Sequence, residues 1–458
     1  MVSQPPQPRV GDRDRWRPRP APAADPAQTP WRVLGGPLGA HTSARSAGTG
    51  ALVRLAVFLP SVPMLFALAL RAWCLQHGFG GQQPLWRACY SDLPSMLGNL
   101  RLGAATGDPV VPATVLGVLA ALVGDVDAGG QTRFVLLWAL VALILLAVCA
   151  VAITAYRPDR VLLFVLCPVL ALGLLISGDL IGVTLMVVGV VAWHRRLDVP
   201  AGVALGLAVF AGAGALTAVV AVVLLSLRVG RSLGRLLLGL AASVVMVVVL
   251  SVGLSGTHAL TDPVLAWWRA VPSYGSFWVL PTVASTSGSL PLSASVRGVL
   301  DAAILSPTGM TVISLLGWGL AIGLMAWLAR RPFRPSIADL TLVGVAVVLL
   351  TAPAIPVQAS LWLVPLVAMS SLSRRDLLAW AGVEVVYFAT VWLYLAGLET
   401  PDRGLPGGWY AFFLTLRVGV IGYLVWAVID NARFGARPQS RSPAHREFAP
   451  NAAQQVPL

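Results

Sequence analysis

Charged residues are scarce in this chain. Only 11% of its 458 residues are Asp, Glu, Lys or Arg, whereas 57% are hydrophobic. Soluble domains carry about 25% charged residues and roughly 45–50% apolar ones. The shortage of charge excludes an ordinary water-soluble globule. It predicts an all-α polytopic membrane protein, most of whose surface faces lipid.

Lysine is absent, so the 32 basic residues are all arginines, and the formal net charge is +13. A basic balance of this kind can indicate nucleic-acid binding. The arginines cluster at the ends of apolar runs, however, as the positive-inside bias of membrane proteins predicts. We therefore expect membrane lipid, and no nucleic acid, as a partner.

Cysteine is also scarce, with four residues and no zinc-binding spacing. Cys149 and Cys167 lie inside apolar runs, where we expect them to be packing residues. Cys74 and Cys89 flank a polar segment that we place outside the membrane, where an oxidising environment permits a disulfide. The sequence leaves open whether this pair is bonded.

Apolar runs of membrane length or somewhat less predict a transmembrane domain over residues 51–430. The flanking segments 1–50 and 431–458 are basic and lack apolar periodicity, which predicts disordered cytoplasmic tails. The twelve runs are approximately 54–73, 133–155, 161–176, 180–194, 199–211, 213–227, 235–254, 308–328, 337–352, 358–371, 375–396 and 409–429.

Arginine placement orients these runs in the plasma membrane with both termini in the cytoplasm. Two long loops, about 74–132 and 255–307, then lie outside. Residues 109–124 are apolar, but if they crossed the membrane, the later arginine-bearing loops would fall on the outer side. We therefore expect this segment to form a juxtamembrane helix in the outer interface. The loops that fall on the cytoplasmic side are 157–160, 194–196, 228–235, 330–334 and 374–375.

Motifs of soluble enzymes are missing: the sequence has no Walker loop, GxGxxG, HExxH or GxSxG at a strand-to-helix junction. Any chemistry is therefore expected at the outer face.

Asp92, in the first exterior loop, is the best candidate for a general base that acts on an acceptor hydroxyl. Alternatively, Ser91 and Asp92 cap a helix. Asp179 lies at the turn of an apolar hairpin, and is either a second catalytic carboxylate or a helix N-cap. If the two carboxylates converge, their repulsion raises one pKa.

A phosphate-bearing donor would need cations, and arginine binds phosphate bidentately. Any one of the exterior arginines alternatively faces solvent or lipid headgroups. A divalent cation, Mg or Mn, would also suit such a donor. The candidate phosphate-binding residues are Arg71, Arg87, Arg101, Arg269 and Arg297, and the further cavity candidates are Tyr90, Ser91, Gln358 and Glu384. Of these, Gln358 and Glu384 would equally serve as interhelical hydrogen-bond partners.

Taken in order, these residues resemble the actinobacterial integral-membrane glycosyltransferases of family 87, within the GT-C superfamily. Cys-Tyr-Ser-Asp at 89–92 falls where the GT-C catalytic carboxylate lies, in the first exterior loop. Four further segments carry the likeness. Residues 177–196 resemble the family's Asn-Trp-Asp-Leu-Leu hairpin, and residues 201–210 resemble its Ala-Gly-x-x-x-Gly-Leu segment. Residues 357–366 resemble its Pro-Gln-Tyr-x-Leu-Trp-Leu-x-Pro-Leu run, and residues 377–397 resemble its Trp-x-x-x-Glu-x-x-Tyr-Phe helix.

The resemblance implies a GT-C-like bundle with juxtamembrane helices in the first exterior loop. It implies a polyprenyl-phosphate sugar donor, typically of mannose, and an inverting transfer to an envelope glycolipid or glycan, with Asp92 as general base. The chain departs from the family where Gly212, Gly214 and Ala215 replace its Lys-x-Tyr-Pro, and where Asp108-Pro109 is the nearest remnant of Glu-Tyr-Pro. These departures indicate a divergent member.

Two other functions fit the same pattern of spans. A lipid or solute transporter, or a flippase, would also contain many spans with broken helices. A non-catalytic scaffold would keep the fold without the chemistry. Sugar transfer, substrate flux and polyprenyl-phosphate binding distinguish the three hypotheses.

Overall fold

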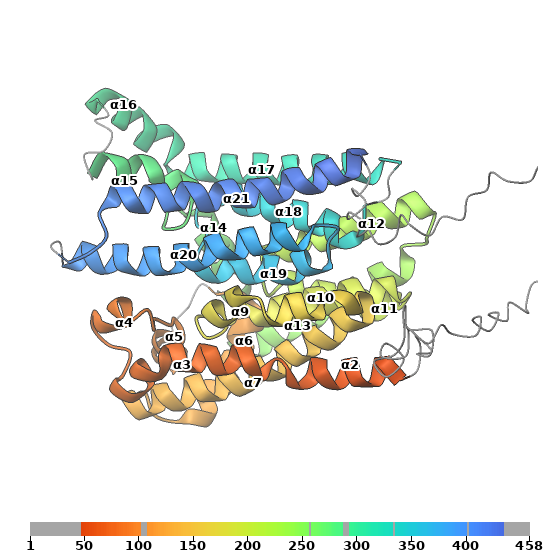
Figure 1. Ribbon diagram of the computed structural model, residues 1–458, viewed down its shortest axis with the longest axis horizontal. Coiled ribbons are helices and arrows are strands. Elements are labelled where there is room, and N and C mark those ends of the chain that lie inside the picture. The colour runs from red at the N-terminus through yellow and green to blue at the C-terminus, as the bar shows by residue number, and fades with distance from the viewer. Residues whose placement is uncertain are drawn as a thin grey trace, which may run out of the picture. The chain divides into compact units, whose positions relative to one another are not determined.

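The computed structural model describes residues 47–101, 108–255, 258–286, 293–332, 335–400 and 403–434, which form helices and loops and no strand (Figure 1). The chain divides into two compact units, Met1–Leu55 and Ala56–Leu458. Every helix from α3 onward lies in the second unit. The tails expected at 1–50 and 431–458 lie outside the described residues, apart from the helical ends at 47–50 and 431–434.

Six helices are long and apolar enough to cross a membrane. An all-α chain with membrane-length helices is therefore confirmed, whereas the expected number of twelve spans is not. The long helices are α2 (Ala47–Phe58) with α3 (Ser61–His77), α7 (Ala128–Tyr156), α13 (Gly234–Ser255), α17 (Pro307–Ala329), α20 (Arg374–Glu399) and α21 (Gly407–Phe434).

The remaining apolar runs form shorter helices, several of which are almost completely buried. Every residue of α19 is buried, as are most residues of α10 and α18. Interrupted helices are tolerated at membrane depth only where protein surrounds them. The burial of α10, α18 and α19 is consistent with their short length. The short helices are α8 (Val161–Val165), α9 (Pro168–Gly173), α10 (Leu180–His194), α11 (Asp198–Val209), α12 (Leu216–Val229), α18 (Ile337–Thr351) and α19 (Ser360–Met369).

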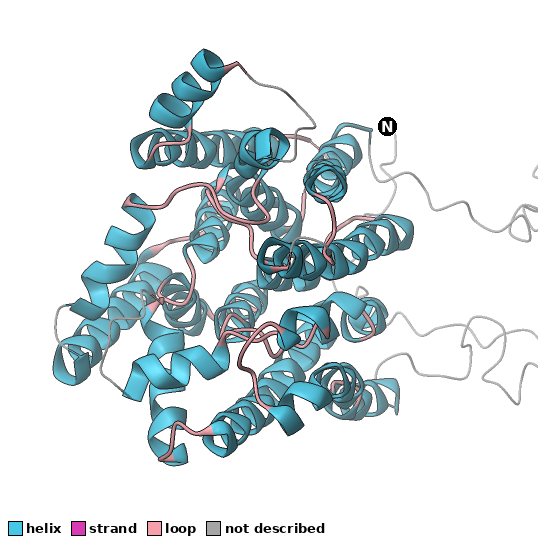
Figure 2. Cartoon of the chain, turned by 90° about the vertical axis from the view of Figure 1, so that its left-hand side faces the viewer, coloured by secondary structure: helices cyan, strands magenta, loops and turns pink. Residues whose placement is uncertain are grey.

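The two long loops of the sequence contain helices of their own. The apolar segment at 109–124 forms a helix, as expected, and its N-terminal neighbour forms another; Figure 2 shows the bundle turned by 90°. The helices of the first loop are α4 (Gln83–Trp86), α5 (Leu93–Arg101) and α6 (Val110–Val123). Those of the second are α14 (His258–Trp268), α15 (Leu280–Thr286) and α16 (Ala294–Val299), followed by a π-helical turn at Leu300–Ile304.

Serine–aspartate pairs begin two of the core helices. At the start of α18, the Ser336 hydroxyl accepts the amide N–H of Asp339, and the Ser336 amide N–H donates to the Asp339 carboxylate. Ser373 and Asp376 make the same two bonds at the start of α20. Such capping boxes satisfy amide groups that have no partner within the helix. The sequence thereby sets the starting points of α18 and α20.

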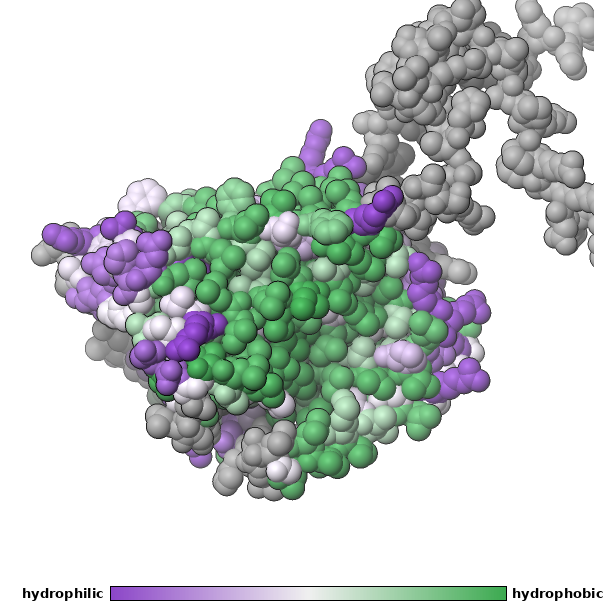
Figure 3. All heavy atoms as spheres, turned by 90° about the horizontal axis from the view of Figure 1, so that it is seen from below, coloured by the Kyte–Doolittle hydropathy of each residue, from purple (hydrophilic) through white to green (hydrophobic). Residues whose placement is uncertain are grey.

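The arginine-bearing loops meet at one end of the bundle, here called the arginine end. The Arg157 guanidinium donates to the carbonyl of Ser370 (2.7 Å), and that of Arg195 donates to the carbonyl of Ala155 (2.6 Å). The Arg231 guanidinium pairs with Asp198. Figure 3 shows a broad hydrophobic face between two groups of hydrophilic residues, as expected of a molecule that crosses a membrane.

Candidate functional site

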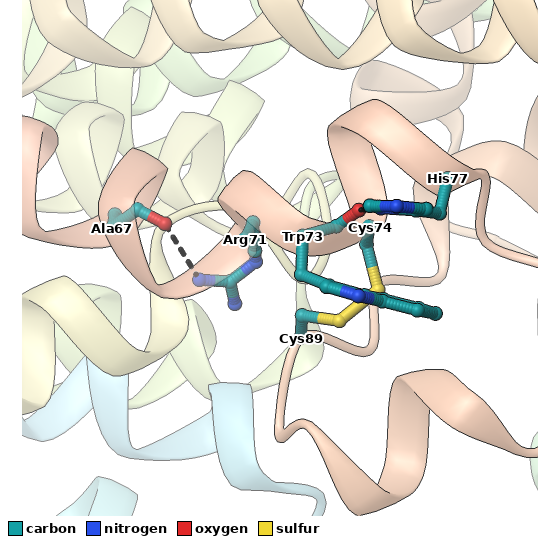
Figure 4. Close-up of a disulfide and its surroundings, with 6 residues drawn as sticks. All are labelled: Ala67, Arg71, Trp73, Cys74, His77 and Cys89. Carbon is teal, nitrogen blue, oxygen red and sulfur yellow. Dashed lines mark hydrogen bonds between the residues drawn. A yellow bond between two sulfur atoms is a disulfide. The ribbon is translucent and has the colours of Figure 1, made fainter.

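A disulfide fixes the chain segment that carries Asp92 to the end of α3. Cys74 and Cys89 are bonded, with their Cα atoms 6.0 Å apart, and both are buried (Figure 4). The ring of Trp73 stacks on that of His77 beside this bond. Because only two residues separate Cys89 from Asp92, the disulfide restricts the position of the carboxylate.

Backbone and hydroxyl groups of this segment bind the interrupted hairpin that carries Asp179. The Ser91 hydroxyl donates to the carbonyl of Leu175 (2.6 Å), and the Asp92 amide donates to the carbonyl of Ile176 (2.9 Å). These carbonyls follow the end of α9, where a helix leaves its last acceptors without partners. The break in the hairpin is thus satisfied by the loop that precedes α5.

Two buried side chains satisfy further carbonyls of the same break. The Arg71 guanidinium donates to Leu172 (2.9 Å), and the Trp138 indole N–H donates to Leu174 (3.1 Å). Arg71 is completely buried, and its other described hydrogen bond is to the carbonyl of Ala67 in its own helix. Arg71 was predicted to bind phosphate; in this structure it holds backbone carbonyls instead, so phosphate binding would require it to leave them.

Asp92 and Asp179 lie close enough to interact electrostatically. Burial is the main cause that raises the pKa of Asp92, and the charge of Asp179 raises it further. Hydrogen bonds from Tyr90 and Gln358 act in the opposite direction, and the Gln358 Nε2–Asp92 Oδ2 distance is 3.3 Å. Four of the residues singled out from the sequence therefore meet at one point.

Asp179 is held by two donors of different kinds. The Ser177 hydroxyl donates to Oδ2 (2.6 Å), and the Trp362 indole N–H donates to Oδ1 (3.2 Å). The six-membered part of the Trp362 ring lies against Gly182 and Gly212, where an added Cβ would come within 2.6 and 2.5 Å of it. The two glycines thus leave the space in which this indole reaches the carboxylate.

A second polar cluster is buried between α19, α20 and α21. The Glu384 carboxylate accepts hydrogen bonds from the Arg417 Nε (3.1 Å) and the Ser360 hydroxyl (2.7 Å). The same guanidinium donates to the carbonyl of Ile355 (2.7 Å) and lies 4.3 Å from the centre of the Tyr387 ring. Charge-assisted hydrogen bonds and a cation–π contact thus compensate the buried charges. Glu384 is therefore part of an interhelical ion pair.

Aromatic residues connect this cluster with the carboxylates. The ring of Tyr90 lies 4.8 Å from that of Trp392 in α20, and the Tyr387 and Tyr410 hydroxyls are 3.2 Å apart. The Tyr410 hydroxyl also accepts the amide of Gly275 (3.0 Å), which fixes the loop after α14 to the bundle.

The other predicted phosphate-binding arginines do not converge on the carboxylates in the described part of the chain. Arg87 is exposed and lies over the Trp73 ring, 5.3 Å from its centre. Arg269 is exposed just after α14. The side chains of Arg101 and Arg297 lie outside the described residues.

The residues at the site fit a divalent cation only in part. No cluster of three or more His, Cys, Asp or Glu side chains occurs among the described residues. Magnesium is often held by one or two carboxylates together with substrate phosphate oxygens and water. Asp92 and Asp179 would be the protein ligands of such an ion, with the donor phosphate supplying others.

Sequence reasoning missed Arg417 and Trp362. Arg417 interrupts the apolar run at 409–429, and the rule that singled out Glu384 as a charge within a span would also have found it. Trp362 carries no such signal, because an indole in an apolar run is an ordinary packing residue. Its hydrogen bond to Asp179 depends on two glycines far away in the sequence.

No known family model, curated protein or solved structure matches this chain.

Proposed function

We propose that this chain is a membrane glycosyltransferase that moves a sugar, mannose in the first instance, from a polyprenyl-phosphate donor to an envelope glycolipid or glycan. The observation that carries the proposal is the convergence of Asp92 with Asp179 and Gln358, from three distant parts of the chain. The order of the sequence segments that resemble GT-C glycosyltransferases of family 87 supports it.

Asp92 is the general base in this proposal. A raised pKa brings a carboxyl group nearer to the pH at which it must accept a proton. Asp92 takes the proton of the acceptor hydroxyl while that oxygen attacks the anomeric carbon. The bond from that carbon to the phosphate oxygen breaks, the polyprenyl phosphate leaves with the electron pair, and the anomeric configuration inverts.

Asp179 orients the acceptor or helps to hold a divalent cation. The indole of Trp362 lies against Gly212. At this position, glycosyltransferase family 87, which the sequence resembles, has lysine. A cation for the departing phosphate must therefore come from elsewhere. We assign this role to Arg87, an exposed residue five positions before Asp92 in the sequence, whose side chain would have to turn from Trp73 toward the phosphate. A divalent cation, when bound, would neutralise part of the phosphate charge.

The proposal also includes a GT-C-like arrangement of twelve spans, with both termini in the cytoplasm and the aspartate pair at the outer face. The short buried helices would supply the spans that fall below membrane length. A donor in the outer leaflet would then reach Asp92 from the side of the bilayer.

Sugar transfer by the purified protein from polyprenyl-phosphomannose tests the proposal. We expect Asp92→Asn to lower the rate by about 10²–10⁴-fold, the usual contribution of a general base. Asp125→Asn removes an exposed carboxylate near the start of α7 and should leave the rate unchanged. Full activity of Asp92→Asn would remove the proposed base, and substrate flux in proteoliposomes without any transfer would favour a transporter.

A further inference from the structure

An open groove runs between α17 and α21, away from the aspartate pair. Its cavity volume is about 530 Å³. Gly319, Gly323 and Leu324 of α17 and Ile429 of α21 line its apolar part, and Trp327 and Arg433 lie at the arginine end. The groove is thus apolar along its length and cationic at one end.

Glycine on α17 keeps this groove open. An added Cβ at Gly319 or Gly323 would meet nothing within 4 Å. Both α17 and α21 pack against α18, which holds them side by side (Figure 1). Exposed leucines at 315, 316 and 320 continue the apolar surface of α17. An elongated apolar group therefore fits along this helix pair.

Two guanidinium groups lie at the polar end of the groove. Arg331 lies 4.0 Å, and Arg433 5.5 Å, from the centre of the Trp327 ring. The Nε atom of Arg331 is buried and has no hydrogen-bond partner among the described residues. Arg228 approaches the same turn, because its guanidinium donates to the carbonyl of Arg331 (2.8 Å). These cations, at the level of a tryptophan, form an environment suited to a phosphate at the membrane–water interface.

We propose that the groove binds an anionic phospholipid, with an acyl chain along Gly319 and Gly323 and its phosphate at Arg331 and Arg433. Charge complementarity favours this occupant over a second copy of the chain. A two-fold axis along the membrane normal would bring Arg331 and Arg433 close to their symmetry mates, and like charges oppose such a contact. This site is separate from the proposed catalytic site.

Native mass spectrometry of the protein in nanodiscs of phosphatidylglycerol and phosphatidylcholine tests the site. We expect one retained phosphatidylglycerol and a weakening on the order of tenfold or more in the double variant Arg331→Gln with Arg433→Gln. Arg375→Gln makes the same type of charge change at an exposed position of the arginine end and should retain the lipid.

A second variant keeps the charges and fills the groove. Gly319→Leu with Gly323→Leu should also release the lipid, whereas Gly253→Leu on α13, where a Cβ likewise meets nothing within 4 Å, should not. Thermal unfolding of each variant shows whether it is folded. Equal retention of both lipids, unchanged retention in folded groove variants, or a dimer that Gly319→Leu with Gly323→Leu dissociates would overturn the proposal.

Discussion

The carboxyl group of Asp92 is subject to opposing influences from its burial and from three neighbouring side chains. Burial and Asp179 raise its pKa, whereas the hydrogen bonds from Tyr90 and Gln358 lower it. Removal of a neighbouring negative charge should therefore lower the pKa of Asp92, and removal of a hydrogen bond to its carboxylate should raise it. The sequence predicted this coupling only on the condition that the two aspartates converge.

Substitution of each neighbour separates these influences. Asp179→Asn removes a negative charge, so the pKa of Asp92 should fall while burial keeps it above the ordinary value. Gln358→Leu removes a hydrogen bond to the carboxylate, so the pKa should rise. The infrared band of the protonated carboxyl, followed against pH and assigned with Asp92→Asn, measures both shifts. Shifts of the same sign in the two variants would contradict this arrangement.

The buried pair of Glu384 and Arg417 gives a second prediction for single residues. Loss of one partner leaves a buried charge uncompensated, which typically costs about 3–5 kcal/mol. We expect Glu384→Gln and Arg417→Met each to lower the midpoint of thermal unfolding in detergent markedly. The double variant should lower the midpoint by less than the sum of the two single-variant changes. Additive losses would show that the side chains are not coupled.

Glu384 could be singled out from the sequence because charge within an apolar run is rare, and Asp92 because it lies in the first exterior loop. Their partners could not be identified in the same way. Asp92 and Gln358 are 266 positions apart, and no periodicity relates them. The same rule applies to Arg417, but nothing in the sequence pairs it with Glu384, which lies on another helix 33 residues earlier in the chain.

Among the helices, α11 and α13 approach each other most closely through glycine. A Cβ at Gly239 would clash with the carbonyl of Val199, and one at Gly202 would clash with that of Leu236. Small residues at such positions allow helix backbones to pack closely within a membrane. Gly253, further along α13, has open space around it.

This difference between two glycines of one helix predicts different effects of the same substitution. Gly239→Val should separate α11 from α13 and destabilise the protein by at least about 1–3 kcal/mol, the usual cost of overpacking, because backbone atoms cannot move aside as side chains do. Gly253→Val should have little effect. Thermal unfolding of the two variants in the same detergent makes the comparison, and equal midpoints would contradict this helix contact.

Helix positions were predicted better than helix lengths. Every apolar run coincides with helix, yet two runs are interrupted: 54–73 contains the end of α2 and the start of α3, and 161–176 contains α8 and α9, separated by Leu166 and Cys167. Pro168 follows directly and cannot continue the hydrogen-bond ladder of α8. The same run ends early, after Gly173, and there Arg71, Trp138 and Ser91 satisfy the carbonyls of residues 172, 174 and 175; these contacts are not visible in hydropathy.

At the scale of the whole molecule, the arginine loops lie together although they are scattered along the sequence. Their hydrogen bonds link the ends of α7, α10, α12, α17 and α19. The sign pattern of the sequence anticipated this grouping because positive charge accumulates on one side of a membrane. The opposite end carries the Cys74–Cys89 disulfide, a bond typical of oxidising compartments.

The helix α20 connects the two ends and makes their orientation testable. It begins at Arg374, and the Thr400 hydroxyl just beyond its last residue donates to Gln82 (2.8 Å). Its 26 residues extend about 39 Å at 1.5 Å per residue, which exceeds a hydrocarbon core of about 30 Å. Cysteines introduced at Gln83 and Arg375, which are both exposed, should therefore lie on opposite sides of the membrane.

A membrane-impermeant maleimide distinguishes the two sides, because the native cysteines are either bonded or buried. Intact cells should label Gln83→Cys, and Arg375→Cys should react only after permeabilisation. The opposite pattern would place the disulfide and Asp92 in the cytoplasm, where neither an oxidised cysteine pair nor a donor in the outer leaflet is expected. Labelling of both positions in intact cells would mean that α20 does not cross the bilayer, and the orientation inferred from arginine would then lose its structural basis.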